Sequence, residues 1–145
     1  MRMKDVIISV TGVQQGVNGP DAMELVTAGQ YGQDEKETLL TWQESELTGM
    51  EGTTTVFQVE PEKVTLLRLG SVQSEMVFEE GRRHMSLYST PYGNMEIGVR
   101  ARRLNSTLEL TGGRLEIDYD IEINHMLAGQ SLFRIDVREN TPVKS

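Results

Sequence analysis

The segment from Leu115 to Asn124 alternates apolar and polar residues without interruption. Its odd-numbered positions hold leucine, isoleucine or tyrosine, and its even-numbered positions hold aspartate, glutamate or asparagine. Because successive side chains of a strand point to opposite faces, this pattern predicts a β-strand with one buried face and one face in water. A chain made of such strands must bury their apolar faces in a sandwich or a barrel.

Similar short runs, separated by turn residues, continue along the chain, and helical periodicity is nearly absent. The predicted strands cover residues 5–13, 23–31, 38–47, 53–60, 63–69, 72–78, 82–90, 94–104, 107–111, 114–124 and 131–138. Residues 14–20, rich in glycine and ending in proline, form the clearest loop, and residues 139–145 are expected to be a frayed tail. No shift in composition divides the chain, so we expect a single domain over residues 1–145.

Five predicted turns test this interpretation, because the length of a hairpin loop fixes which side chains share a face. The turns are Pro61-Glu62, Glu79-Glu80-Gly81, Tyr92-Gly93, Asn105-Ser106 and Gly112-Gly113. In the corresponding registers Val59 pairs with Val64, Phe78 with Arg82, Tyr88 with Ile97, Arg103 with Leu108, and Leu110 with Leu115. Apolar faces line up across these hairpins. Since a long meander leaves two open edges unless it closes, we expect an all-β fold, a single antiparallel up-and-down β-barrel.

The composition excludes several classes of function. The 22 acidic residues outnumber the 14 basic ones, and a net charge of −8 disfavours nonspecific binding to nucleic acid or to an anionic membrane. Without cysteine the chain has no disulfide, no thiolate nucleophile and no cysteine-bound zinc. The N-terminal residues lack the apolar stretch of a signal peptide, and no later segment is long enough to span a membrane, so we expect a cytoplasmic protein.

Four groups of segments resemble a known family. They are Leu40 to Glu46 with Gly49 to Thr55, Met76 to Gly81, Thr90 to Gly93 with Ile97 to Val99, and Ile117 to Tyr119 with Glu122 to Asn124. Together they resemble the YwiB-like family of uncharacterised bacterial proteins over nearly the whole chain. The resemblance implies a calycin-type, lipocalin-like β-barrel. It carries over no activity, cofactor or catalytic residue.

The inward face is the place to look for a function, because a small barrel is either filled by side chains or holds one small ligand. The polar residues predicted to face inward are Thr55, Arg68, Arg82, His84, Ser86, Tyr88 and Arg103, joined by Glu44 and Glu46 if Trp42 points inward. An unpaired arginine would suit a carboxylate or phosphate ligand. Alternatively, Arg68 or Arg82 pairs with Glu44 or Glu46, or lies in water at a barrel end.

The residues predicted to line a ligand site are Trp42, Glu44, Arg68, His84, Tyr88 and Arg103. None receives a catalytic role, and no metal or cofactor is predicted, since paired-histidine spacings and phosphate-binding loops are absent from the sequence. Four arginines are also expected to gather, with Arg82 opposite Arg103 and Arg83 opposite Arg102. This arginine cluster would either attract an anion or an acidic partner, or be neutralised by acidic residues of the same chain.

Three functions follow from these residues. The leading hypothesis is a barrel that binds a small amphipathic or anionic ligand in or at the mouth of its lumen. The alternative is a protein–protein interaction module with a fully packed barrel, and the third is an enzyme, which needs His84 beside a carboxylate in an open cleft. A filled core with Arg68 paired internally favours the module, whereas a cavity of about a few hundred Å³ favours the ligand.

Overall fold

The computed structural model describes residues 1–16 and 19–140. Within these residues the chain forms antiparallel strands and one short 3₁₀ helix, η1 (Glu46–Thr48). The strands are β1 (Lys4–Gly16), β2 (Gly19–Gln33), β3 (Thr38–Gln43), β4 (Thr53–Val59), β5 (Lys63–Gly70), β6 (Ser74–Glu79), β7 (Arg83–Thr90), β8 (Gly93–Ser106), β9 (Gly112–Ile123) and β10 (Met126–Glu139). No helix of the described part is long and apolar enough to cross a membrane.

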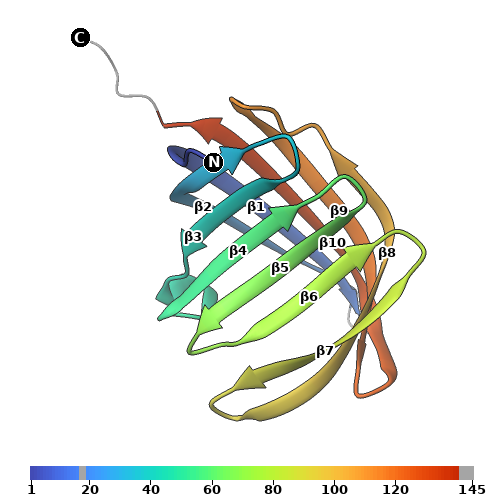
Figure 1. Ribbon diagram of the computed structural model, residues 1–145. Helices are drawn as coiled ribbons and strands as arrows, with labels where there is room; N and C mark the ends of the chain where they lie inside the picture. The colour runs from blue at the N-terminus through green and yellow to red at the C-terminus, as the bar shows by residue number, and fades with distance from the viewer. Residues whose placement is uncertain (17–18, 141–145) are drawn as a thin grey trace.

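All ten strands belong to one sheet whose order is β6-β5-β4-β3-β2-β1-β10-β9-β8-β7. Each strand therefore lies beside its neighbours in the chain, and the first strand also pairs with the last one. The sheet curls until its two edge strands, β6 and β7, face each other (Figure 1). The predicted all-β, antiparallel up-and-down barrel is confirmed.

Some of the predicted strand registers are confirmed and others are wrong. At the Pro61-Glu62 turn the pairing of Val59 with Val64 is confirmed. Between β7 and β8 the hairpin exists, but Tyr88 pairs with Met95, so the predicted partner Ile97 was wrong by two residues and only the shared face was right. The predicted loop 14–20 is largely wrong, because β1 extends to Gly16 and β2 begins at Gly19. Val17 and Asn18 of that loop lie outside the described residues. Residues 141–145 of the predicted tail also lie outside them.

The predicted strand 107–111 and its two tight turns are also wrong. Strand β8 instead continues to Ser106 and pairs directly with β9, with Leu104 opposite Ile117. The register shifts between Ala101 and Arg103, which marks a β-bulge in β8. A bulge adds one residue to a strand, so side chains after it change faces.

The connection 107–111 closes one end of the barrel. Its backbone carbonyls accept hydrogen bonds from β1 and β2: Glu109 O from the Tyr31 hydroxyl at 2.6 Å, Leu108 O from Gln33 Nε2 at 3.0 Å, and Leu110 O from Lys4 Nζ. Burial raises the pKa of Tyr31 to about 12, with the negative charge of Glu109 acting in the same direction, so the hydroxyl stays protonated as a donor. This segment is a cap rather than a strand.

A line of aromatic rings fills the middle of the barrel. Ring centroids are 5.7 Å apart for Trp42 and Phe57, 6.3 Å for Phe57 and Phe133, 5.9 Å for Phe133 and Tyr119, and 4.8 Å for Tyr119 and Phe78. The rings come from β3, β4, β10, β9 and β6 and so join opposite walls. Such rings bury large apolar areas. The rings therefore occupy part of the barrel interior.

The barrel wall has a slit between β6 and β7. The two strands are bridged at one end by Gln73 and Ser89, which exchange hydrogen bonds of 3.0 and 2.9 Å, and at the other end by Glu79 and Arg82. Between these bridges the described residues form no ladder. The predicted hairpin register of Phe78 with Arg82 is thus wrong, because Arg82 pairs with Glu79 across a loop that is one residue shorter and the strands then diverge (Figure 1).

The slit predicts an alternating pattern of amide hydrogen exchange. Backbone groups alternate in direction along a strand, so Val77 and Met85 direct their N–H groups into the slit, whereas Met76 and Ser86 direct theirs into paired neighbours. Amides in the slit should exchange at least about a hundredfold faster than these neighbours. Exchange followed by NMR measures this, and equal protection of Val77 and Met76 would show that the wall is closed.

Candidate functional site

The open end of the barrel, opposite the cap, is formed by the connections β1–β2, β3–β4, β5–β6, β7–β8 and β9–β10. A pocket of about 580 Å³ lies at this end, and we call it the mouth pocket. Its lining residues are Thr48, Gly49, Met50, Arg68, Ser71, Val72, Tyr88, Pro91 and Tyr92. Two of the predicted site residues, Arg68 and Tyr88, thus line one pocket.

Arg68 is the residue of the mouth pocket whose bonding is incomplete. It stands on β5 between Thr55 of β4 and Ser74 of β6. The Arg68 Nε atom is buried without a hydrogen-bond partner, and among the described residues the guanidinium takes part in no ion pair. The neighbouring Ser74 hydroxyl is also buried without a partner. Unpaired buried polar groups are costly, so two such groups side by side need an explanation.

The hydrogen-bond partners of the Glu44 carboxylate do not include an arginine. Its Oε1 accepts hydrogen bonds from Trp42 Nε1 at 2.8 Å and Thr55 Oγ1 at 3.0 Å, and its Oε2 accepts one from Thr48 Oγ1 at 2.9 Å. The carboxylate is only 8% exposed. The predicted pairing of Arg68 with Glu44 is therefore absent, and Glu46 lies exposed on η1. Glu44 instead ties the η1 segment to β3 and β4 at the edge of the mouth pocket.

Tyr119 connects the arginine with the aromatic line. Burial raises the pKa of Tyr119, and a hydrogen bond with Ser131 and the positive charge of Arg68 act in the opposite direction. Arg68 is thus close enough for its charge to be felt at the Tyr119 hydroxyl. The Tyr119 ring in turn stacks on Phe133.

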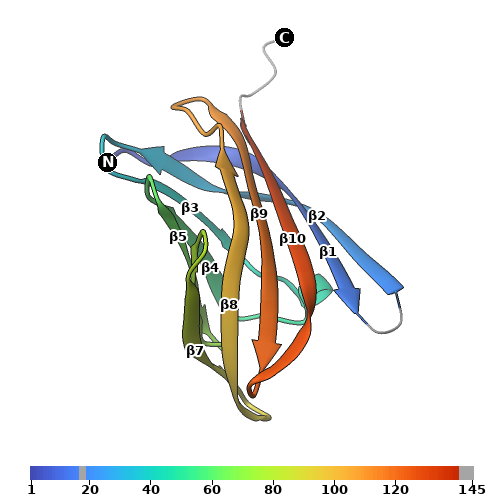
Figure 2. The same cartoon turned by 90° about the vertical axis from the view of Figure 1, so that its right-hand side faces the viewer.

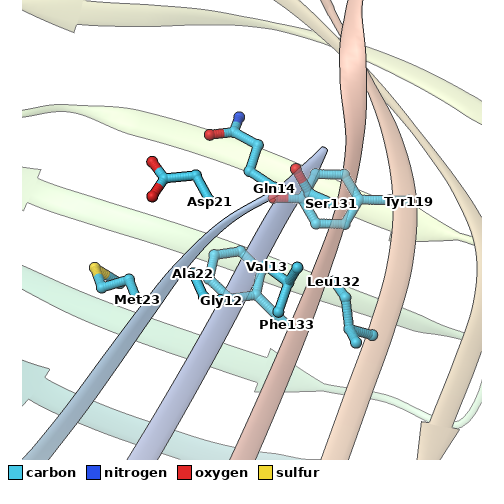
Figure 3. A pocket seen from close by; sticks show the side chains of 10 residues that line it. All are labelled: Gly12, Val13, Gln14, Asp21, Ala22, Met23, Tyr119, Ser131, Leu132 and Phe133. Carbon is cyan, nitrogen blue, oxygen red and sulfur yellow. The ribbon is translucent and has the colours of Figure 1, made fainter. Parts of the chain in front are cut away.

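A second pocket of about 310 Å³ lies at the tip of the long β1–β2 hairpin, and we call it the hairpin pocket (Figure 3). The hairpin projects beyond its neighbours (Figure 2). The residues that line the pocket are Gly12, Val13, Gln14, Asp21, Ala22, Met23, Tyr119, Ser131, Leu132 and Phe133. Sequence reasoning missed this pocket because it assigned residues 14–20 to a loop.

The other predicted residues do not gather at the mouth pocket. Trp42 is buried on β3 beside Glu44. His84 lies nearer the capped end of β7, where its Nε2 is 3.1 Å from Glu79 Oε1, a carboxylate that Arg82 also approaches at 3.8 Å. Arg103 was predicted to face inward, and this is wrong: after the bulge it pairs with Asp118 and is exposed. Of the six candidates, Arg68 and Tyr88 line the mouth pocket, and Glu44 lies at its edge through its bond to Thr48.

The predicted arginine cluster is arranged differently from expectation. Arg83 stands opposite Arg100, not Arg102, because the β7–β8 hairpin turns at Pro91-Tyr92, one residue earlier than predicted, which shifts every partner by two residues. Acidic partners are close by: Arg83 contacts Glu122, and Arg102 contacts both Asp118 and Asp120 of β9. These contacts favour neutralisation within the chain over an anion site.

These observations define a class of protein: an antiparallel barrel with one capped end and one open, arginine-bearing end. Comparison with known proteins gives the family. The chain belongs to the family described as Domain of unknown function (DUF1934), whose model matches residues 8–135.

Two comparisons agree with this assignment. The chain is 23% identical over 118 residues to the uncharacterized β-barrel protein YwiB of Bacillus subtilis (strain 168), covering 81% of this chain and 82% of that protein. The crystal structure of the ywiB protein from Bacillus subtilis superposes with a TM-score of 0.84 at 20% identity, over 96% of this chain and 94% of the other. At this identity the structural likeness supports the fold alone.

The bonding of Glu44 predicts a large stability effect. Replacing Glu44 by alanine leaves buried Trp42 and Thr55 donors without an acceptor, so we expect Glu44→Ala to lower the free energy of unfolding by about 3 kcal/mol. Glu44→Gln should lose less, because the amide oxygen still accepts. Glu46→Ala, on the exposed side of η1, is the matched control. Urea unfolding measures all three, and equal losses for Glu44→Ala and Glu46→Ala would contradict this role.

Proposed function

We propose that this protein binds a small anionic or amphipathic molecule at the mouth of its barrel. The observation that carries the proposal is Arg68, an inward-facing arginine with a buried, unpartnered Nε at a pocket of about 580 Å³. A guanidinium presents a planar fork of donors that matches a carboxylate or a phosphate. The Ser74 hydroxyl on the neighbouring strand is a further unused donor.

A purely structural role explains Arg68 poorly. A buried cation contributes to stability only when a counter-charge and hydrogen bonds offset the cost of its desolvation. Glu44, the carboxylate predicted to pair with Arg68, accepts hydrogen bonds from three neutral donors and forms no ion pair with Arg68. An anionic ligand would supply the missing counter-charge, and the aromatic line below would hold it at the mouth.

A second candidate function, a protein-interaction module, is favoured by one feature of the outer wall. Leu69, Met85 and Leu87 are 54%, 40% and 57% exposed on the outside of β5 and β7. Exposed apolar side chains on the outside of a barrel suit a protein partner. This candidate predicts that Leu87→Ser changes association with a partner, whereas Arg68 variants leave it unchanged.

The anion proposal is tested with acetate and inorganic phosphate as probes. Fluorescence of Trp42, the single tryptophan of the chain, reports on the site because its indole is bonded to Glu44. We expect saturable binding that Arg68→Met weakens at least about tenfold, since a charge-assisted hydrogen bond is lost. Arg103→Gln removes an equal charge from the exposed outer wall and should bind as the wild type does.

The stability of the same variant gives an independent check. Because Arg68→Met removes a half-buried charge that takes part in no ion pair among the described residues, its free energy of unfolding should equal or exceed the wild-type value by up to about 1 kcal/mol. Failure of both anions to bind the wild-type protein, or equal affinity for Arg68→Met, would contradict the proposed function. A strongly destabilised Arg68→Met would instead identify Arg68 as a structural residue.

A further inference from the structure

Gly12 lies in the interior of β1, and neither its backbone conformation nor a close neighbour requires a glycine there. Its backbone lies outside the left-handed region that favours glycine, and a Cβ placed on it would meet Phe133 Cε1 at 3.9 Å and Met23 Cε at 4.0 Å. Both distances are ordinary van der Waals contacts. Glycine weakens a strand because it is flexible and has no side chain to pack. A valine at this position would satisfy the strand better.

Other glycines inside strands differ from Gly12. A Cβ on Gly29 would come within 2.4 Å of Ile8 and of the Thr41 carbonyl, and on Gly98 within 2.8 Å of Met85. At Gly29 the Thr41 backbone leaves no room for a Cβ. At Gly12 a Cβ fits in ordinary contact, and the glycine lines a pocket.

That space is the floor of the hairpin pocket. Gly12 pairs with Met23 of β2 on one side and with Phe133 of β10 on the other, so apolar side chains flank it. Figure 3 shows the Phe133 and Tyr119 rings, with Met23 on the neighbouring strand. Gln14 and Asp21 add polar groups to the lining. A hydrocarbon chain would find an apolar surface at Gly12.

The hairpin pocket is linked to the proposed anion site through Tyr119. This ring lines the hairpin pocket, stacks on Phe133 with centroids 5.9 Å apart, and lies near Arg68. The β1–β2 and β9–β10 connections place the hairpin pocket at the same open end of the barrel as the mouth pocket.

We infer that the hairpin pocket is an apolar subsite of the mouth, kept open by Gly12, and that the ligand is an amphipathic anion. Its carboxylate or phosphate group binds Arg68, and its hydrocarbon segment passes Tyr119 and lies on Phe133 and Met23. This inference rests on the proposed function. It narrows the ligand class from small anions in general to anions with an apolar tail.

A competing explanation is that Gly12 lets the Phe133 ring lie across the strand, as aromatic rings do over glycines in sheets. The two explanations differ in what a side chain at position 12 does. If the glycine serves the ring, Gly12→Val displaces Phe133 and destabilises the fold. If the glycine serves a ligand, Gly12→Val fills empty space and leaves the fold at least as stable.

The test compares octanoate with acetate, which share the carboxylate and differ in the tail. Wild-type protein should bind octanoate at least about a hundredfold more tightly than acetate, because each buried methylene adds to the affinity. Gly12→Val should keep acetate binding and its thermal midpoint, and should lose at least about tenfold in octanoate affinity. Thr11→Val places the same side chain on the opposite face of β1 and is the matched control.

The outcomes separate this inference from the proposed function. Acetate binding that depends on Arg68, together with octanoate affinity unchanged by Gly12→Val, overturns the subsite and leaves the anion site standing. An affinity for octanoate no higher than that for acetate also overturns the subsite and leaves the anion site standing. A clear drop in the thermal midpoint of Gly12→Val assigns the glycine to packing and overturns the inference, and absence of any binding overturns both.

Discussion

The pairing of β1 with β10 is the constraint on which the rest of the structure depends. Ten residues of each strand stand opposite one another, from Val6 with Glu139 to Gln15 with Gln130. This ladder joins the beginning of the described chain to its end and turns a meander into a barrel. It also brings Phe133 of β10 beside Gly12 of β1, so closure and the hairpin pocket have one origin.

Closure then decides where a ligand can bind. The aromatic line from Trp42 to Phe78 occupies the middle, and the segment 107–111 caps one end through the Tyr31 and Gln33 side chains. Polar groups that would be costly in the middle are tolerated at the open end, where water or a ligand can reach them. Arg68 stands at this boundary, its Nε has no hydrogen-bond partner, and no described residue forms an ion pair with it.

Local sequence patterns predict much of this arrangement, but not all of it. Alternation predicts β9 and the inward direction of Arg68, and turn chemistry predicts the Val59–Val64 register. The bulge before Arg103 leaves no mark in the alternation, so Arg103 was placed on the wrong face. The unpaired state of Arg68 also could not be predicted, because it depends on Thr48 and Thr55 reaching Glu44 from other parts of the chain.

Direct contact between an anion and Arg68 is the central claim, and NMR of the arginine Nε–H groups tests it most directly. The Arg68 resonance is identified by its loss in Arg68→Met, and octanoate is added stepwise to the wild-type protein. If the anion binds Arg68, this resonance shifts saturably while that of exposed Arg103 stays in place. An Arg68 resonance that does not move, or an equal drift of every arginine, would contradict it.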